Sequence, residues 1–265
     1  MQKTDLKYRM LARSAHAPPG QIKMQTQSPL PHASLDLTSR AKKALKIERL
    51  LDLQPREEPI ELLEIGTGSG GIAHYFANHP QLNCNVSAVD RVDQRQIHLG
   101  IDFKLVQDTH LPYPDGRFDV VISNHVIEHV GEEPAQRHHL SEIRRVMKAD
   151  GIGYLAAPNR WMLVEPHYQL PFLSCLPRSL QTPYLRLFGH GEGYDCFPLS
   201  KAKIESLLKA GFNYDFLSSK AIYTMIDIAD QNTLALKILA LFPFTLLDAV
   251  GTINPTLIYR IIPKR

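Results

Sequence analysis

The stretch LLEIGTGSGG, residues 62–71, decides the fold. An apolar run, residues 60–65, stands directly before a glycine-rich turn, and a helix is predicted behind it over residues 71–79. Gly66 and Gly68 permit a tight turn and let a ligand approach the backbone, while the start of the helix offers free amide groups. A strand, a glycine turn and a helix in this order are typical of nucleotide-binding α/β proteins.

The rest of the chain alternates in the same way. Further strands are predicted over residues 85–89, 103–106, 118–123, 152–157, 212–218 and 256–262, and further helices over residues 38–53, 135–148, 200–210 and 233–249. Thr38 or Ser39 is expected to cap the first helix, and Ser200 a later one. Apolar strands alternating with helices indicate a doubly wound α/β sheet that is covered by helices on both faces, with ligands at the carboxyl ends of the strands.

Composition sets limits on the class of protein. The chain has 265 residues, of which 44% are hydrophobic and 22% charged, which argues against a disordered or coiled-coil chain. Its net charge is +3, and the excess lies in residues 1–60, which hold 11 basic and 6 acidic side chains. The remainder is too close to neutral to indicate a nucleic-acid partner. No signal peptide or membrane-spanning run is recognisable, so a cytoplasmic protein is expected.

Four segments are distinguished by their patterns. Residues 1–37 are predicted to be a flexible basic arm, and residues 38–265 a single domain. Residues 158–199 contain six prolines and many aromatic side chains without a periodicity, which indicates a substrate lid. Residues 221–251 are predicted to be an apolar helical insertion. Its densest part, residues 234–250, is expected to cover an apolar substrate, touch a membrane surface, form a dimer contact or act as a core helix.

Further motifs follow the glycine turn at regular separations. They are Val89-Asp90, Asp108 with Leu111-Pro112, Phe118-Asp119-Val120-Val121, Glu128-His129 and Arg145-Val146. With Glu64 and the turn, they resemble the motifs of the class I S-adenosylmethionine (SAM)-dependent methyltransferases, in the broad group that includes the ubiquinone- and menaquinone-biosynthesis enzymes. The resemblance covers residues 60–157 and, in layout, residues 200–262. It implies SAM as cofactor and a Rossmann-like sheet of seven strands, parallel except for the antiparallel last strand.

The resemblance implies ten residues at the cofactor. Those around the methionine part of SAM are Glu64, Gly66, Thr67, Gly68, Gly70 and Asn124. Those around the ribose and adenine are Asp90, Arg91, Asp108 and Thr109. Glu64 is expected near the amino group, directly or through the turn. Asp90 is expected to bind the ribose hydroxyls and Asp108 the adenine amino group, with a turn-capping role as the alternative for Asp108.

The stretch HVIEH, residues 125–129, follows the fourth strand. It matches an inverted zinc-protease signature, but its place inside a cofactor-binding arrangement argues against that chemistry. The three cysteines are also too scattered for a zinc site, so no metal is expected. Methyl transfer to oxygen or nitrogen can need a general base, and His129 is the first candidate, with Glu128 and His125 behind it. A packing histidine that shapes the pocket is the alternative.

Side chains after the fifth strand are predicted to bind substrate. They are Arg160, Trp161, Glu165, His167 and Tyr168. The alternative is that the aromatic rings only anchor an irregular loop.

These observations predict transfer of a methyl group to an oxygen of a small, lipid-like or glycan-type molecule, with nitrogen or carbon less favoured. The alternatives are an NAD(P)-dependent oxidoreductase on a Rossmann scaffold and a non-catalytic nucleotide-binding protein. The turn also fits the dinucleotide pattern G-x-G-x-x-G, but the chain lacks the Tyr-x-x-x-Lys expected of such an oxidoreductase. Besides the substrate, a peripheral membrane contact is the partner considered.

Overall fold

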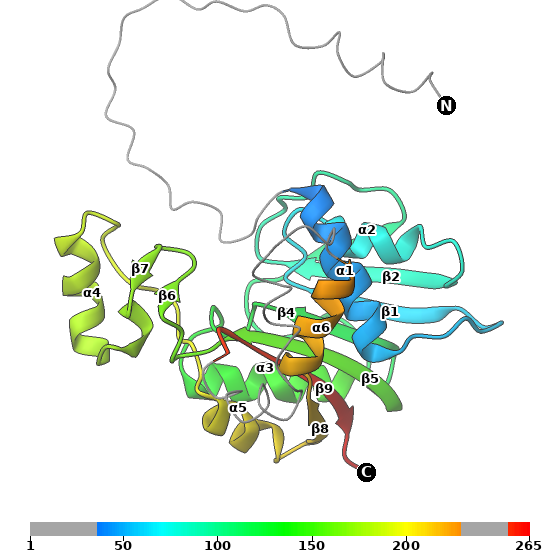
Figure 1. Ribbon diagram of the computed structural model, residues 1–265. Coiled ribbons are helices and arrows are strands. Elements are labelled where there is room, and N and C mark those ends of the chain that lie inside the picture. Colours follow the sequence, from blue (N-terminus) through cyan, green and yellow to red (C-terminus); the bar gives the residue numbers. More distant parts are fainter. Residues whose placement is uncertain (1–35, 229–253) are drawn as a thin grey trace, which may run out of the picture. The chain divides into compact units, whose positions relative to one another are not determined.

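In the computed structural model, the described residues are 36–228 and 254–265. The strands of the main sheet and the helices that cover it follow one another in the predicted order (Figure 1). The main sheet contains β1 (Ile60–Ile65), β2 (Cys84–Asp90), β3 (Ile101–Leu105), β4 (Phe118–Asn124), β5 (Met147–Pro158), β8 (Phe212–Phe216) and β9 (Thr256–Pro263). The helices around it are α1 (Leu37–Leu51), α2 (Gly71–Ala77), α3 (Glu133–Val146), α5 (Lys201–Leu208) and α6 (Ser218–Ile228).

The seven strands lie in the order β3-β2-β1-β4-β5-β9-β8. The strand β9 is antiparallel to both β5 and β8, and the other neighbours are parallel. This confirms the predicted sheet, including its antiparallel last strand. The chain runs outward from β1 to β3 and then returns to β4 on the other side of β1. The order of the strands therefore reverses between β1 and β4, where doubly wound sheets bind their ligands.

Helices cover both faces of the sheet, as predicted. On one face, α1, α2 and α6 bury Ile47, Leu50, Phe76 and Ala221 against the strands. On the other face, α3 and α5 bury a second set that includes Ile143 and Leu208. Figure 1 shows α1 beside α6, and α3 on the same side as α5. Two separate apolar cores thus clamp the sheet and hold its carboxyl edge in place.

The caps of two helices test the sequence interpretation. Asp36 caps α1, because its carboxylate accepts from the amides of Thr38 (3.2 Å) and Ser39 (3.0 Å). The predicted cap at Thr38 or Ser39 was therefore wrong by two to three residues. The prediction for α5 was right, since Ser200 accepts from the Lys203 amide at 3.3 Å.

The predicted lid, residues 158–199, contains regular structure that the sequence pattern did not indicate. It holds a short hairpin of β6 (Val164–Glu165) and β7 (Leu170–Pro171), the 3-10 turn η1 (Leu173–Cys175) and the helix α4 (Arg178–Leu187). Pro183 lies inside α4 and disguised it as a loop. The segment has its own small core of Leu170, Leu173, Leu185, Tyr194 and Cys196. Figure 1 shows β6, β7 and α4 together, to one side of the sheet.

Two predicted segments lie largely outside the described residues. Of the arm predicted over residues 1–37, the structure describes Asp36 and Leu37, which belong to the start of α1. Of the insertion predicted over residues 221–251, it describes the part in α6, up to Ile228. The apolar stretch 234–250 is not described, and the domain boundaries stay predictions. Within the described residues, no helix combines the length and the apolar character that a membrane span requires.

Candidate active site

The ends of four neighbouring strands bring the predicted cofactor residues to one edge of the sheet. In β1, Ile65 pairs with Val89 of β2 and with Ser123 of β4. The glycine turn that follows β1 therefore lies between Asp90 and Asn124, the last residues of those two strands. Asp108 follows β3, the next strand out. This arrangement agrees with a ligand that lies across the carboxyl edge at the point where the strand order reverses.

The glycine turn depends on backbone conformations that other residues adopt poorly. Gly66 has φ +72° and Gly70 has φ +78°, both in the left-handed region. The turn is fixed to β2 because the Gly66 amide donates to the carbonyl oxygen of Val89 at 2.8 Å. A Cβ atom on Gly66 would lie 2.5 Å from Cγ2 of Val126, so the chain after β4 packs directly against this turn.

The side chain of Glu64 is hydrogen-bonded to the glycine turn and to the start of α2. Its carboxylate is 2% exposed and accepts from the Thr67 hydroxyl at 2.7 Å and from the Ala73 amide at 2.9 Å. The carboxylate is thus enclosed by the turn, and the predicted place of Glu64 near the amino group of SAM stays a prediction. Burial raises the pKa of Glu64 to about 7, although these hydrogen bonds and the charge of Arg40 act in the opposite direction.

Arg40 is a residue of this site that the sequence pattern did not indicate. It lies on α1, where its side chain is largely buried and packs over Gly71: a Cβ atom on that glycine would lie 2.6 Å from the Arg40 Cβ. Its positive charge favours the ionised form of Glu64. The helix α1 thus packs against the start of α2, directly behind the glycine turn. No local motif marks such a role, because it depends on the packing of α1 against α2.

The carboxylate of Asp90, which is predicted to bind the ribose, is hydrogen-bonded to the glycine turn. Its Oδ2 accepts from the Gly68 amide at 2.8 Å and its Oδ1 from the Arg91 amide at 2.7 Å. The side chain is half-buried at the edge of the sheet, whereas that of Arg91 is exposed. The predicted roles of these two residues stay predictions.

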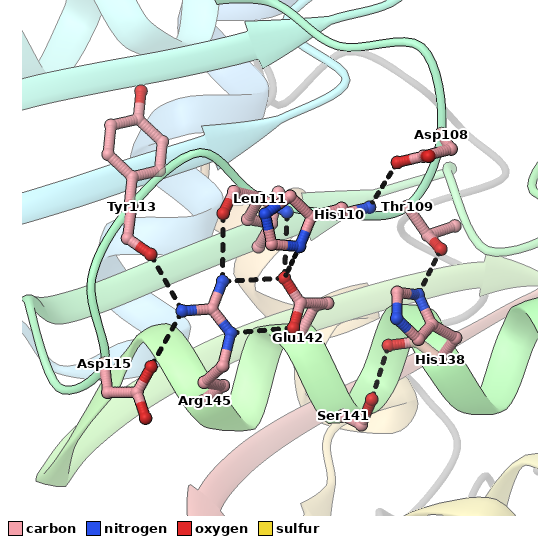
Figure 2. Close-up of polar contacts among 10 residues, drawn as sticks. All are labelled: Asp108, Thr109, His110, Leu111, Tyr113, Asp115, His138, Ser141, Glu142 and Arg145. Carbon is pink, nitrogen blue, oxygen red and sulfur yellow. Dashed lines mark hydrogen bonds and ion pairs between the residues drawn. The ribbon is translucent and has the colours of Figure 1, made fainter.

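The loop that carries Asp108 is fastened to α3 (Figure 2). Arg145 donates to the carbonyl oxygens of Leu111 (2.9 Å) and Tyr113 (2.8 Å), and Glu142 accepts from the Leu111 amide at 2.9 Å. At the other end of the loop, the exposed Asp108 accepts from the His110 amide at 2.8 Å. This contact is the turn-capping role considered as its alternative. The cofactor role of Asp108 stays a prediction.

Thr109, predicted to lie at the adenine, contacts α3 instead of the sheet edge. Its hydroxyl forms a hydrogen bond with Nδ1 of His138, as Figure 2 shows. In this structure the side chain therefore helps to anchor the loop. A cofactor contact of Thr109 also stays a prediction.

The three predicted catalytic residues lie together just beyond β4. Glu128 is fully buried, with its Oε1 atom 3.4 Å from Nδ1 of His125 and 3.8 Å from Nε2 of His129. Burial alone would raise the pKa of Glu128, but the contact with His125 and the charges of both histidines hold it below its ordinary value. His125 follows Asn124 directly and has φ +58°, a conformation that histidine tolerates better than most residues. An ionised carboxylate therefore lies between two half-buried imidazoles.

The lid reaches this group through a backbone contact. The Phe197 amide donates to the carbonyl oxygen of Glu128 at 2.7 Å, which brings Cys196 beside His129. Its Sγ atom lies 3.7 Å from the Nδ1 atom of His129, whose ring centroid is 5.1 Å from that of His167. Burial, and behind it the charges of Asp195, Glu165 and Glu128, raise the pKa of the Cys196 thiol. The sequence pattern did not indicate Cys196, because no other candidate residue stands near it in the chain.

The predicted substrate residues fall into two groups. Glu165 is buried and accepts from the Tyr168 amide at 2.7 Å, in a turn that holds His167 against His129. The Tyr168 hydroxyl donates to Asp195 at 2.9 Å. The side chains of Arg160 and Trp161 are exposed instead. Arg160 lines a cavity of about 470 Å³ between α3 and the lid, which Cys196 also borders. Of these five residues, the structure thus places His167 against His129, with Glu165 and Tyr168 in or beside the same turn.

Comparison with known proteins identifies the kind of domain that this part of the chain resembles. Residues 63–155 match the family model described as a methyltransferase domain. Over these residues the chain is similar to methyltransferase domains. The match includes the glycine turn, the Asp108 loop and the catalytic candidates, and it favours the methyltransferase prediction over the oxidoreductase. SAM is the cofactor that this family implies, as predicted. The narrower ubiquinone- and menaquinone-like group stays a prediction.

A curated relative and two solved structures are similar to the chain. Ajmaline N-methyltransferase of Rauvolfia serpentina is 30% identical over 88 residues, so the match spans 30% of its length. The plantazolicin methyltransferase BpumL, solved with a monoazolic desmethylPZN analog and SAH, has a TM-score of 0.52 at 15% identity, covering 86% of this chain and 85% of its own. The CurJ carbon methyltransferase has a TM-score of 0.51 at 16% identity, covering 85% and 58%. At this identity, the two structures show a shared fold.

Proposed function

We propose that the protein transfers the methyl group of SAM to an oxygen atom of a small, lipid-like or glycan-type acceptor. The domain family supports the methyl transfer and the cofactor. The contact between His125 and the buried Glu128 carries the choice of oxygen, because a hydroxyl acceptor needs a base whereas a more acidic or more nucleophilic acceptor can react without one.

The turn and the strand ends would hold SAM. Gly66, Gly68 and Gly70 form the left-handed turn that would hold the methionine part, Asn124 would lie beside it, and Asp90 would offer its carboxylate to the ribose. Bound SAM supplies a methyl group that is attached to a sulfonium sulfur. When the acceptor oxygen attacks the methyl carbon, the carbon–sulfur bond breaks and the sulfur leaves as a neutral thioether. The contribution of the protein is to place the acceptor in line and to remove its proton.

His125 is the base that we propose, in place of His129, which was the first candidate. Its Nδ1 atom faces Glu128 at 3.4 Å, so the carboxylate can hold the ring with the Nε2 atom directed to a proton on the acceptor. This pairing follows the logic of other carboxylate-oriented histidine bases. The Nδ1 atom of His129 faces Cys196 of the lid instead. Glu128 orients His125.

The lid supports an apolar acceptor. The lid contains seven large apolar residues that are at least half exposed: Trp161 (50%), Leu163 (69%), Val164 (53%), Phe172 (56%), Leu180 (52%), Leu187 (79%) and Phe188 (53%). A concentration of this kind on one segment marks a surface that meets another apolar molecule. It favours the lipid-like acceptor over the glycan-type one.

The experiment measures transfer of a labelled methyl group from SAM to the organic and aqueous fractions of a cell extract. Label is expected in an acid- and base-stable ether in the organic fraction. His125→Ala should lower the rate at neutral pH by about 10²–10⁴-fold, with partial recovery as rising pH ionises the acceptor. His190→Ala, on the exposed part of the lid, is the matched control. Label on nitrogen or carbon, or an unchanged pH profile in His125→Ala, would contradict the proposal.

A further inference from the structure

The cluster at the contact between the lid and the turn after β4 has the composition of a metal site. His129, His167 and Cys196 each present one ligand atom, and the three atoms all lie within 4.8 Å of one another. They come from three separate segments: the turn after β4, the turn between β6 and β7, and the irregular segment between α4 and α5. The chain places them together only through its tertiary fold.

We propose that His129, His167 and Cys196 bind one Zn²⁺ ion and leave a fourth coordination position open. Imidazole nitrogen and thiolate sulfur are the ligands that Zn²⁺ takes in proteins. With Zn–N and Zn–S bonds of about 2.1 and 2.3 Å, tetrahedral geometry requires about 3.6 Å between sulfur and nitrogen. The Cys196 Sγ and His129 Nδ1 atoms are 3.7 Å apart, so this pair needs almost no movement.

The surroundings of His129 are those of a metal ligand. Its other nitrogen, Nε2, faces the buried Glu128 carboxylate at 3.8 Å. Carboxylates commonly occupy this position behind a ligating histidine, where they select the tautomer that leaves the ligating nitrogen unprotonated. Glu128 thus contacts both histidines. It orients His125 on the cofactor side and His129 on the lid side.

The charge at this contact also favours a divalent cation. Glu128 and Glu165 are both at most 1% exposed, and Oδ1 of Asp195 lies 3.6 Å from the Cys196 sulfur. The guanidinium of Arg178 lies nearby, but it donates to the backbone carbonyls of Cys196 and Tyr194, both at 2.8 Å. Binding would release the thiol proton to solvent, as Zn²⁺ requires of a cysteine ligand.

A metal at this place would fasten the lid to the sheet. The hydrogen bond from Phe197 to Glu128 already joins the two, and the ion would add ligands from both sides of that contact. The open position would lie beside the predicted acceptor residues, where a hydroxyl or a water molecule can bind. The proposal is independent of the identity of the base and of the methyl acceptor.

The test uses the full chain with any polyhistidine tag removed, and Zn²⁺ or Co²⁺ alone as the probe. One equivalent of Zn²⁺ is expected to bind, and Co²⁺ to show a thiolate charge-transfer absorption. Cys196→Ser should abolish that absorption, and His167→Asn should lower the affinity for Zn²⁺ at least tenfold. Cys175→Ser and His190→Asn, which change the same residue types elsewhere in the lid segment, should bind as the unaltered chain does.

A second measurement needs no variant. Cys196 is buried, so its alkylation is followed by mass spectrometry in urea below the unfolding midpoint. There Zn²⁺ should slow the modification of Cys196, while Cys175 and Cys84 react at their former rates. The proposal is overturned if no stoichiometric Zn²⁺ binds, if Cys196→Ser and His167→Asn bind as well as the unaltered chain, or if Cys196 is not protected. Titration with SAM accompanies each variant. If the unaltered chain does not bind SAM, that result counts against the proposed function and not against the metal site.

Discussion

The amide of Gly68 donates to the carboxylate of Asp90 across 2.8 Å, which ties the glycine turn after β1 to the end of β2. The same carboxylate accepts from the Arg91 amide, so both oxygens are oriented before any ligand arrives. A carboxylate that is held in this way can bind the two hydroxyls of a ribose with little loss of conformational entropy.

Asp90→Asn should therefore lower the affinity for SAM by about 10–100-fold, since hydrogen bonds to a charged group contribute about 1.5–3 kcal/mol. The asparagine keeps an oxygen for the Gly68 amide, so the melting temperature should change little. Calorimetric titration with SAM measures the affinity. Asp93→Asn is the control, because that carboxylate pairs with Arg95 in a neighbouring loop. Equal affinities of Asp90→Asn and the unaltered chain would refute the ribose role.

Glu64 should make stability depend on pH. Its pKa rises to about 7 in the folded chain from an ordinary 4.5, so the folded state binds more protons between these values. Stability therefore falls as pH rises from about 4.5 to 7, by about 3 kcal/mol, and stays at the lower level above pH 7.

Glu64→Gln should remove this dependence, because its oxygen still accepts from Thr67 and Ala73 but cannot ionise. Urea unfolding of both proteins at pH 5 and pH 8 measures the difference. As pH rises, the free energy of unfolding of Glu64→Gln should increase relative to that of the unaltered chain. A constant difference across this range would show that the carboxyl group does not titrate there.

Arg145 should matter for both stability and cofactor affinity. Arg145→Ala removes the donors to Leu111 and Tyr113 and leaves Glu142 without its guanidinium partner (Figure 2). The expected cost is about 2–3 kcal/mol of unfolding free energy, and SAM should bind more weakly because the Asp108 loop is released from α3. Arg144→Ala, on the same helix, should cost less than about 1 kcal/mol, since the Arg144 side chain donates to the carbonyl of Lys264. Equal effects of the two changes would contradict this reasoning.

Gly66→Ala tests the turn by adding one methyl group. The new Cβ atom would overlap Cγ2 of Val126 at 2.5 Å, at a residue with φ +72°. A loss of about 2–4 kcal/mol is expected from the overlap and the backbone conformation together. Val126→Ala combined with Gly66→Ala should recover the part due to overlap, which a double-mutant cycle isolates. Strictly additive effects would show that the two positions do not contact each other.

Local patterns were sufficient for the framework of this protein. The apolar run of β1 and the glycines behind it specify a strand, a turn and a helix through contacts between residues close in the chain. The repetition of that unit predicted the doubly wound sheet, and the order of the motifs predicted the methyltransferase domain. Helix boundaries and caps were predicted less accurately. The side chains of Asp36, Thr38 and Ser39 can all cap a helix, and the path of the chain decides which of them does.

Tertiary structure alone decided what meets the histidines after β4. Cys196 stands 67 residues from His129 in the chain, and no periodicity relates them. The helix α4 was hidden by Pro183, so the path that returns Cys196 to Glu128 was not visible in the sequence. Arg40 reaches the glycine turn for a similar reason, through the packing of α1. Sequence patterns record the periodicity of single elements, whereas contacts between distant segments arise from burial and shape that no local pattern encodes.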